Sequence, residues 1–284
     1  MEINLLSPHG YCNGVKKALL IVTEALRNPN TKKPIYLLGN IIHNKYVSKK
    51  LESLGAITID TNESRLKMLD YIDKGTVVFS AHGVSDKVRQ KAISKGLDII
   101  DATCPNVLFI QKKVKDYLSK GYKIIYIGTQ KHPECEAILE LSSDIYLYFE
   151  TLNLSSFKDK FVYVTNQTTL SLLDIENIYN KIKENLPNAI IDNKICNATT
   201  KRQLCVLENS ADICIVVGDK LSSNSKKLCE VAKRSSNASY LVESVKDLEN
   251  ISFKGINKVN VTSAASTPEE LTLSIIDYLK KIEE

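Results

Sequence analysis

Three cysteines stand at equal intervals in the 284-residue chain: 92 residues separate Cys12 from Cys104, and again Cys104 from Cys196. Each follows a short apolar run and precedes a segment with helical character. A helix N-terminus favours the thiolate form of cysteine, and the thiolate is the form that binds metals. We therefore expect the three cysteines to occupy one position in a threefold repeat and to hold a shared metal ion or cluster.

The other four cysteines fit structural roles. Cys205 and Cys229 lie in helical patterns, Cys214 lies in an apolar strand pattern, and Cys135 follows a helix start, so small buried thiols are expected. Seven cysteines is an odd number, and the first residues lack the basic start of a secretory signal. These features indicate reduced thiols and a cytoplasmic protein.

The repeated units share more than a cysteine. In each unit one strand candidate ends in a glycine, at Gly39, Gly128 and Gly218, and a later one ends in small polar residues. Strands that alternate with helices at this spacing predict an α/β fold with mostly parallel sheets. Binding groups gather at the carboxyl ends of parallel strands. Three units with these edges turned inward would bring the cysteines to one centre.

The histidines and one glutamate fall at the same edges. His43, His82 and His132 follow strand candidates, whereas His9 is expected to be a capping or solvent-facing residue. Glu134 lies in the first turn of an expected helix, where a glutamate commonly compensates the helix dipole. A general acid there would need a pKa raised by burial, which the helix N-terminus opposes. Both roles of the glutamate stay open.

Hydroxyl and amide side chains gather before two expected helices. One residue of the Ser222–Ser225 run should cap a helix, and the others would form a neutral site for phosphate or carboxylate. A capping box is expected from Thr267 to Glu270, which leaves Ser266 free. Glycine-rich fingerprints of dinucleotide and P-loop sites are absent from the sequence. The HPEC segment lacks the PCxxC partner of zinc deaminases.

Composition excludes several classes of protein. The chain is 43% hydrophobic, enough for packed cores, yet no apolar run approaches the ~20 residues of a membrane helix. The net charge is +5, spread without a basic run, and there is no tryptophan. These features argue against a nucleic-acid or membrane partner and suggest an acidic one.

Nine motifs in register resemble the family of 4-hydroxy-3-methylbut-2-enyl diphosphate reductases. They are PHGYCNGV, GNIIHN, SAHGVS, DATCPNV, HPE, NQTTLS, ICNATTKRQ, GDKLSSNS and SAASTPE, and they run through the whole chain. The resemblance implies three pseudo-equivalent α/β domains in a three-lobed arrangement around a central cluster. It implies domains at 13–103, 104–195 and 196–284, the last completed by an N-terminal strand in residues 1–12.

The resemblance also implies a reaction and a cofactor. The family reduces (E)-4-hydroxy-3-methylbut-2-enyl diphosphate, an allylic diphosphate, to isopentenyl and dimethylallyl diphosphates, the last step of the non-mevalonate isoprenoid pathway. Cys12, Cys104 and Cys196 would hold a [4Fe–4S] cluster whose fourth iron is open to substrate, and loss of that iron would leave [3Fe–4S]. A ferredoxin or flavodoxin would donate electrons, and a monomer is expected.

The family's functional residues carry over by motif. The implied catalytic residues are Glu134, Thr168 and His132. The implied substrate-binding residues are His43, His82, His132, Thr168, Ser222, Ser223, Asn224 and Ser266. The chain departs from the family pattern at His9, Tyr11, Thr129, Gln130, Asn197 and Ala264. These departures bear on rates and inhibitor response more than on the reaction.

Two alternatives remain open. A zinc-dependent hydrolase or deaminase-type enzyme would use the same cysteines with Glu134 as acid or base, and a non-catalytic redox sensor would use the iron–sulfur cluster alone. Zinc sites commonly draw two ligands from one short stretch, which the sequence does not offer. A sensor has no need for so many phosphate-type donors.

Overall fold

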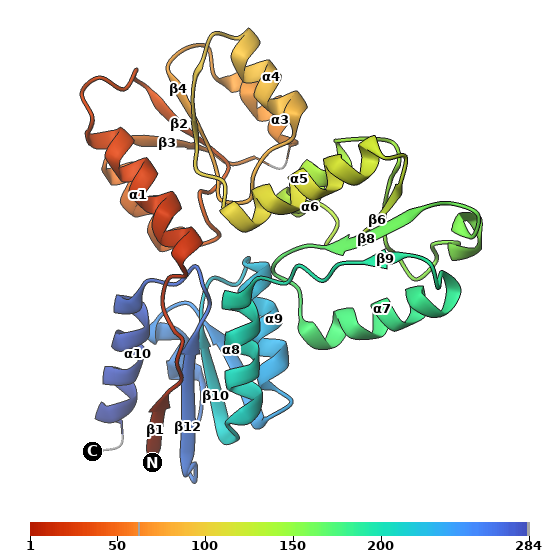
Figure 1. The fold of residues 1–284 in the computed structure, drawn as a ribbon. Helices are drawn as coiled ribbons and strands as arrows, with labels where there is room; N and C mark the ends of the chain where they lie inside the picture. Colours follow the sequence, from red (N-terminus) through yellow and green to blue (C-terminus); the bar gives the residue numbers. More distant parts are fainter. Residues whose placement is uncertain (62, 283–284) are drawn as a thin grey trace.

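The computed structural model describes residues 1–61 and 63–282. They form three lobes, each built on one four-stranded parallel sheet with helices packed against it (Figure 1). The predicted α/β fold of three pseudo-equivalent units is confirmed.

The first lobe has the strand order β3-β2-β4-β5. Its elements are α1 (Asn13–Arg27), β2 (Ile35–Leu38), α2 (Lys45–Ser53), β3 (Ala56–Ile59), α3 (Arg65–Met68), the 3₁₀ helix η1 (Leu69–Tyr71), β4 (Thr76–Phe79), α4 (Asp86–Ser94) and β5 (Asp98–Asp101). The central strands are apolar and buried on both faces, as helix-covered parallel strands must be. Helix α1 packs Ala18 and Val22 into this core.

The second lobe has the strand order β7-β6-β8-β9. Its elements are α5 (Pro105–Ser119), β6 (Lys123–Ile127), α6 (Pro133–Leu139), β7 (Ile145–Leu147), η2 (Leu154–Phe157), β8 (Val162–Asn166), α7 (Leu172–Asn185) and β9 (Ile190–Ile191). Helix α5 packs Ile110 and Val114 in one core cluster. Helix α7 packs Ile175 and Ile182 in another. The sheet is therefore covered on both faces.

The third lobe has the strand order β1-β12-β10-β11. Its elements are α8 (Asn197–Glu208), β10 (Ala211–Val217), α9 (Ser223–Ala232), β11 (Ser236–Val242), η3 (Val245–Asn250), β12 (Lys258–Ser263), α10 (Glu269–Lys281) and the N-terminal strand β1 (Glu2–Leu5). Strand β1 pairs with β12, with Ile3 opposite Val259. The first strand of the chain thus forms the edge of the last sheet, and the termini lie together (Figure 1).

The three lobes repeat one order of elements. In each, a helix that begins after one of the spaced cysteines leads into an interior strand, β2, β6 or β10. Those strands end just before Gly39, Gly128 and Gly218. The strands that precede the cysteines, β1, β5 and β9, are all edge strands. The exact domain boundaries at 13–103, 104–195 and 196–284 stay predictions.

One local prediction was wrong. Helix α10 begins at Glu269 with Pro268 in the capping position, and no side chain caps it. The Thr267 hydroxyl instead donates to the buried carbonyl of Val217 at 2.9 Å, where β10 ends. The Thr267 hydroxyl is therefore engaged with a carbonyl that is distant in the sequence, and the expected capping box does not form. No helix among the described residues is long and apolar enough to cross a membrane.

Candidate active site

The three spaced cysteines lie in one cavity at the meeting point of the lobes. Each occupies the N-cap position of a helix: Cys12 for α1, Cys104 for α5 and Cys196 for α8. Figure 1 shows these three helices beginning near the centre of the molecule. Pro105 occupies the first turn of α5, as its missing N–H predicts. The threefold repeat therefore brings the thiols together, as the spacing predicts.

Glycine is required beside these thiols. A Cβ built on Gly14 would lie 2.7 Å from the Sγ of Cys104 and 3.8 Å from the Sγ of Cys12. Side-chain carbons do not approach sulfur so closely, so the first turn of α1 needs a glycine there. Asn106 Nδ2 donates to the Sγ of Cys196 at 3.2 Å, which ties the second lobe to the third.

A buried cation lies beside the thiols. Arg202 is 3% exposed. Its guanidinium donates to three backbone carbonyls, those of Ala198, Gly10 and Ser263. Burial lowers the pKa of Arg202, and the nearby Cys12 and Cys196 oppose that shift. Arg202 therefore places a fixed positive charge beside Cys12 and Cys196. In the sequence, Arg202 stands out only as part of the ICNATTKRQ motif.

Three histidines from different loops form a second group in the cavity. The ring centroids of His43 and His82 are 4.5 Å apart, and His132 lies 5.5–5.8 Å from both. Burial lowers the pKa of each ring, and that of His132 falls to about 3. The three imidazoles are therefore neutral near pH 7.

The hydrogen bonding of His132 decides between a metal and an anion as the partner of this group. One nitrogen atom from each ring lies within 4.8 Å of the others, close enough to share a metal ion. However, His132 caps α6, and its Nδ1 accepts the Glu134 N–H at 3.2 Å. The proton of the neutral ring is therefore on Nε2, which donates instead of offering a lone pair. The group is better suited to an anion.

Arg65 stands behind the histidines and was missed by the sequence analysis. It is 9% exposed, and Nη1 donates to the carbonyl of Leu38 at the end of β2. A Cβ on Gly39 would lie 3.0 Å from Nη2, so glycine allows this approach. Burial lowers the pKa of Arg65 to about 10, so it stays charged at neutral pH. That charge also lowers the pKa of all three histidines. No motif surrounds Arg65 that would have identified it.

Glu134 is 2% exposed and faces Thr168. The backbone N–H of Thr168 donates to Oε1, and its hydroxyl donates to Oε2, both at 2.8 Å. Burial raises the pKa of Glu134 to about 7, against the hydrogen bonds from Thr168 and Tyr126. Burial therefore outweighs the hydrogen-bond donors, and the carboxyl can hold a proton at neutral pH. Tyr126, 3.4 Å away, is a further contact that the sequence did not indicate.

Unpaired donors lie on the third-lobe side of the cavity. Ser222 caps α9, where it accepts the Ser225 N–H at 3.3 Å, as the sequence predicts for one residue of this run. Asn224 Oδ1 accepts from Thr199, which leaves Nδ2 to donate. Within the described part of the chain, Asn224 Nδ2 and the Ser266 hydroxyl are buried without a hydrogen-bond partner. Buried donors of this kind are available to a ligand, and an anion fits them.

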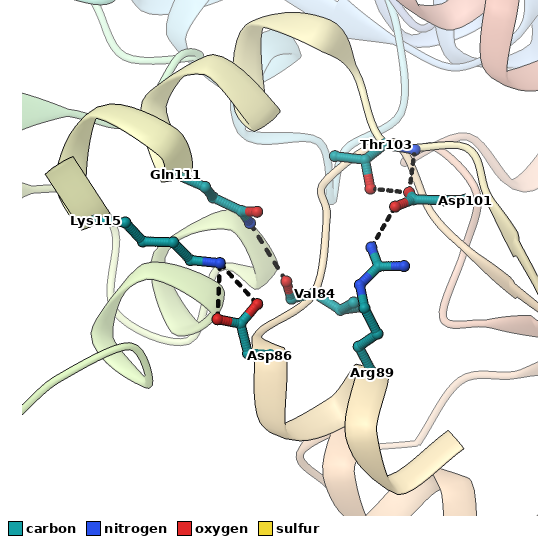
Figure 2. A network of polar contacts seen from close by, with 7 residues as sticks. All are labelled: Val84, Asp86, Arg89, Asp101, Thr103, Gln111 and Lys115. Carbon is teal, nitrogen blue, oxygen red and sulfur yellow. Dashed lines mark hydrogen bonds and ion pairs between the residues drawn. The ribbon is translucent and has the colours of Figure 1, made fainter. Parts of the chain in front are cut away.

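A polar network holds the His82 loop against α5 (Figure 2). Gln111 donates to the carbonyl of Val84 at 3.4 Å, and Lys115 pairs with Asp86 at 2.7 Å. Gly83 has a φ of +76°, and a Cβ there would lie 2.9 Å from Gln111 Nε2. Only glycine fits this turn, so it fixes the residue next to His82.

The same network shapes the turn before Cys104. Thr103 donates from its backbone N–H and its hydroxyl to Asp101, which also pairs with Arg89 (Figure 2). Burial opposes ionisation of Asp101, but these hydrogen bonds outweigh it and lower its pKa. Asp101 of the DATC segment therefore stabilises the turn that orients Cys104.

All the residues predicted for the site line this one cavity. They are Cys12, His43, His82, Cys104, His132, Glu134, Thr168, Cys196, Ser222, Ser223, Asn224 and Ser266. His9 is not among the lining residues and lies 3.9 Å from Glu269. Cys135, Cys214 and Cys229 are buried in hydrophobic clusters, and Cys205 packs against one. The roles of the lining residues stay predictions.

Comparisons with known proteins cover nearly the whole chain. The family model described as LytB protein matches residues 3–280. A 4-hydroxy-3-methylbut-2-enyl diphosphate reductase from Symbiobacterium thermophilum is 42% identical over 288 residues, which cover 99% of this chain and 97% of that protein. The protein of the same name from Listeria monocytogenes is 40% identical over 289 residues, covering 100% of this chain and 87% of that protein.

Solved structures have the same fold. The E-1-hydroxy-2-methyl-but-2-enyl-4-diphosphate reductase from Plasmodium falciparum aligns with a TM-score of 0.90 and 34% identity, over 98% of this chain and 88% of that one. A structure of (E)-4-hydroxy-3-methyl-but-2-enyl diphosphate reductase, the terminal enzyme of the non-mevalonate pathway, aligns with a TM-score of 0.69 and 26% identity, over 99% of this chain and all of that one. This chain therefore belongs to the LytB family.

Proposed function

We propose that this chain catalyses the reductive dehydroxylation of (E)-4-hydroxy-3-methylbut-2-enyl diphosphate to isopentenyl and dimethylallyl diphosphates. The observation that carries the proposal is one cavity that combines three kinds of group. It holds three thiols at helix N-termini, a buried carboxyl with a pKa of about 7, and donors without partners. The family membership and the names of the relatives support the same reaction.

The donor set fits an iron–sulfur cluster. Cys12, Cys104 and Cys196 line one cavity, Gly14 leaves room beside two of the sulfurs, and Arg202 supplies a balancing charge. We propose that these cysteines hold a [4Fe–4S] cluster, which would supply the electrons and an iron open to substrate.

We propose that the diphosphate binds between the three histidines and the Ser222–Asn224 segment. Neutral imidazole N–H groups, hydroxyls and the Asn224 amide donate to the phosphate oxygens. Such bonds are strong because the acceptor is charged and most of the donor side chains are buried. Arg65 adds a full positive charge behind the histidines, and the same charge lowers their pKa values, so the rings remain neutral donors.

We propose that Glu134 supplies the proton that the leaving hydroxyl needs. The C–O bond of the allylic alcohol breaks, the hydroxyl leaves as water, and the allylic carbon skeleton gains two electrons and one further proton. A carboxyl with a pKa of about 7 is substantially protonated near pH 7, which suits a general acid. Thr168 holds the carboxyl in position through both of its oxygens.

We further propose that a ferredoxin or flavodoxin donates the electrons and that the chain acts as a monomer in the cytoplasm. Ferredoxins and flavodoxins are acidic, and this chain carries a net charge of +5. Opposite net charges favour the encounter of two proteins.

Anaerobic turnover tests the proposal. Protein purified without oxygen is mixed with reduced methyl viologen, and the allylic diphosphate is then added. We expect viologen oxidation only after that addition, with isopentenyl and dimethylallyl diphosphates identified by mass spectrometry. Oxidation without these products, or no oxidation by protein that contains the cluster, would overturn it.

A further inference from the structure

One buried carboxylate joins two lobes next to the central cavity. Asp219 follows β10 in the third lobe and is 5% exposed. Its Oδ2 accepts the backbone N–H of Lys45, the first residue of α2 in the first lobe, at 3.0 Å. Its Oδ1 accepts the backbone N–H of Leu221, in its own lobe, at 2.7 Å. The two oxygens of Asp219 therefore form a bridge between the first and third lobes.

Both ends of this bridge lie beside residues that line the cavity. His43 stands two residues before Lys45, and Ser222 directly follows Leu221. The backbone N–H of Ser222 also donates to the carbonyl of Asp219 at 3.1 Å. The turn that leads into α9 is thus held by the side chain and the backbone of one aspartate, as is typical of this residue type. Asp219 connects the histidine side of the cavity with the hydroxyl side.

The bridge uses a backbone donor that α2 cannot satisfy by itself. The first N–H groups of a helix have no partner within the helix. Asn44 caps α2 by accepting the Val47 N–H, and the N–H of Lys45 is given to Asp219. Within the part of the chain that the structure describes, the first turns of α2 and α9 contain no acidic residue. A carboxylate is favoured at a helix N-terminus, so an aspartate suits this position.

The junction around the bridge is otherwise open. Lys45 and Asp219 both line two separate pockets, so there is space on either side of their contact. Further along α2, Lys50 lies 3.7 Å from Glu270 of the third lobe, but these side chains are 64% and 55% exposed. Exposed ion pairs contribute little to stability. The buried bridge is therefore better able than this pair to hold α2 against the third lobe.

We propose that Asp219 is a positioning residue for the diphosphate, because it holds the His43 loop of the first lobe opposite the Ser222–Asn224 segment of the third. Donors from both lobes can then reach the same anion. The inference deepens the proposed function and rests on it, since it assumes that the diphosphate binds between these two groups.

The charge of Asp219 gives the proposal a distinctive sign. Burial and Arg65 lower the pKa of His43, and Asp219 opposes that shift, so its negative charge reaches this side of the cavity. By charge alone, removal of the carboxylate would strengthen the binding of an anion. Loss of the bridge would weaken it. The two effects therefore have opposite signs in a variant that lacks the carboxylate.

The bridge can also be broken while the carboxylate stays in place. Lys45→Pro removes the backbone N–H at the first helical position, where proline is tolerated. Asn44 before it has φ −159° and ψ 109°, an extended conformation that suits a residue preceding proline. Lys45→Ala is the matched control, because it removes the same side-chain charge and keeps the N–H.

Binding and turnover are measured on anaerobically purified protein. The quantities are the Kd of inorganic diphosphate, KM and kcat for the allylic diphosphate, and the midpoint of thermal unfolding. For Lys45→Pro we expect Kd and KM to be about tenfold higher than for Lys45→Ala, with a much smaller change in kcat. Equal Kd and KM values for the two variants, or an effect confined to kcat or to thermal stability, would overturn the positioning role.

Asp219→Asn is a second probe. Asparagine has nearly the same shape but only one acceptor oxygen, so it cannot hold both N–H groups. Asp212→Asn is its control, because Asp212 lies near the start of β10, away from the cavity lining, and also accepts two backbone N–H groups, those of Asn257 and Lys258, at 2.9 Å.

We expect the Kd of inorganic diphosphate to rise about tenfold in Asp219→Asn and to stay at the wild-type value in Asp212→Asn. Tighter binding by Asp219→Asn would show that the charge and not the bridge matters, which would contradict the proposal. Failure of the proposed function gives a different result. Wild-type protein would then bind neither inorganic diphosphate nor the allylic diphosphate, and the positioning role would fall with the site.

Discussion

Thr168 donates two hydrogen bonds to Glu134, one to each carboxylate oxygen and each 2.8 Å long. The two residues come from different parts of the second lobe, since Glu134 opens α6 and Thr168 follows β8. The pair fixes the carboxyl in the cavity wall and lowers a pKa that burial raises. The contact with Thr168 thus affects both the position and the pKa of Glu134, the proposed proton donor.

Glu134→Gln should retain the cluster but lose most turnover. Glutamine has nearly the same shape and cannot donate a proton as an acid. General acid catalysis contributes about 10²–10⁴-fold in rate, so we expect a fall in kcat of that size. Viologen oxidation and the iron content are measured on the same sample. Near-normal kcat would remove Glu134 from the mechanism.

The proposed role of Glu134 also predicts how activity depends on pH. Because the protonated carboxyl is the active form, kcat should fall as pH rises through about 7. Thr168→Val removes a donor that stabilises the carboxylate, so the pKa of Glu134 should rise. The fall in kcat should then occur at higher pH than in the wild type. Thr168→Ser keeps the hydroxyl, so kcat should fall at the same pH as in the wild type. If kcat of Thr168→Val falls at the same pH as that of the wild type, a group other than Glu134 controls the pH dependence.

His132→Asn separates helix capping from anion binding. Asparagine caps helices well, so α6 and the free energy of unfolding should be preserved. The variant loses the donor at Nε2. A hydrogen bond to a charged group contributes about 1.5–3 kcal/mol, so KM for the diphosphate should rise about 10- to 100-fold. An unchanged KM at normal thermal stability would contradict a role for His132 in binding the diphosphate.

Arg65→Gln should raise the pKa of His43, His82 and His132, because it removes a positive charge that disfavours their protonation. The lost charge should also weaken diphosphate binding. NMR titration of the imidazole rings and KM measurements check both effects, with Arg65→Lys as the variant that keeps the charge. Unaltered histidine titration in Arg65→Gln would rule out the electrostatic role.

The spacing of the cysteines predicts much of the fold, because equal spacing with matched contexts implies equivalent structural positions. It places Cys12, Cys104 and Cys196 at helix starts, where they are found. Motifs near strand ends likewise indicate the histidines and the Ser222 segment.

The supporting residues could not be predicted in this way. Arg65 and Arg202 act through tertiary contacts with backbone carbonyls far away in the sequence, so no local pattern marks them. The balance between burial and hydrogen bonding at Glu134 depends on the packing of Tyr126 and Thr168. The expected capping box does not form because the Thr267 hydroxyl donates to the carbonyl of Val217, which is 50 residues away in the sequence. Long-range packing decided each case.

The central claim is that Cys12, Cys104 and Cys196 hold the cluster that reduces the substrate. Iron and acid-labile sulfide are measured in anaerobically purified wild type, in each of the three Cys→Ser variants, and in Cys205→Ser and Cys229→Ser as controls. We predict about four of each ion per chain in the wild type and controls, and a marked loss in the three variants. Stoichiometric zinc without iron in the wild type, or equal iron loss in the controls, would contradict the account.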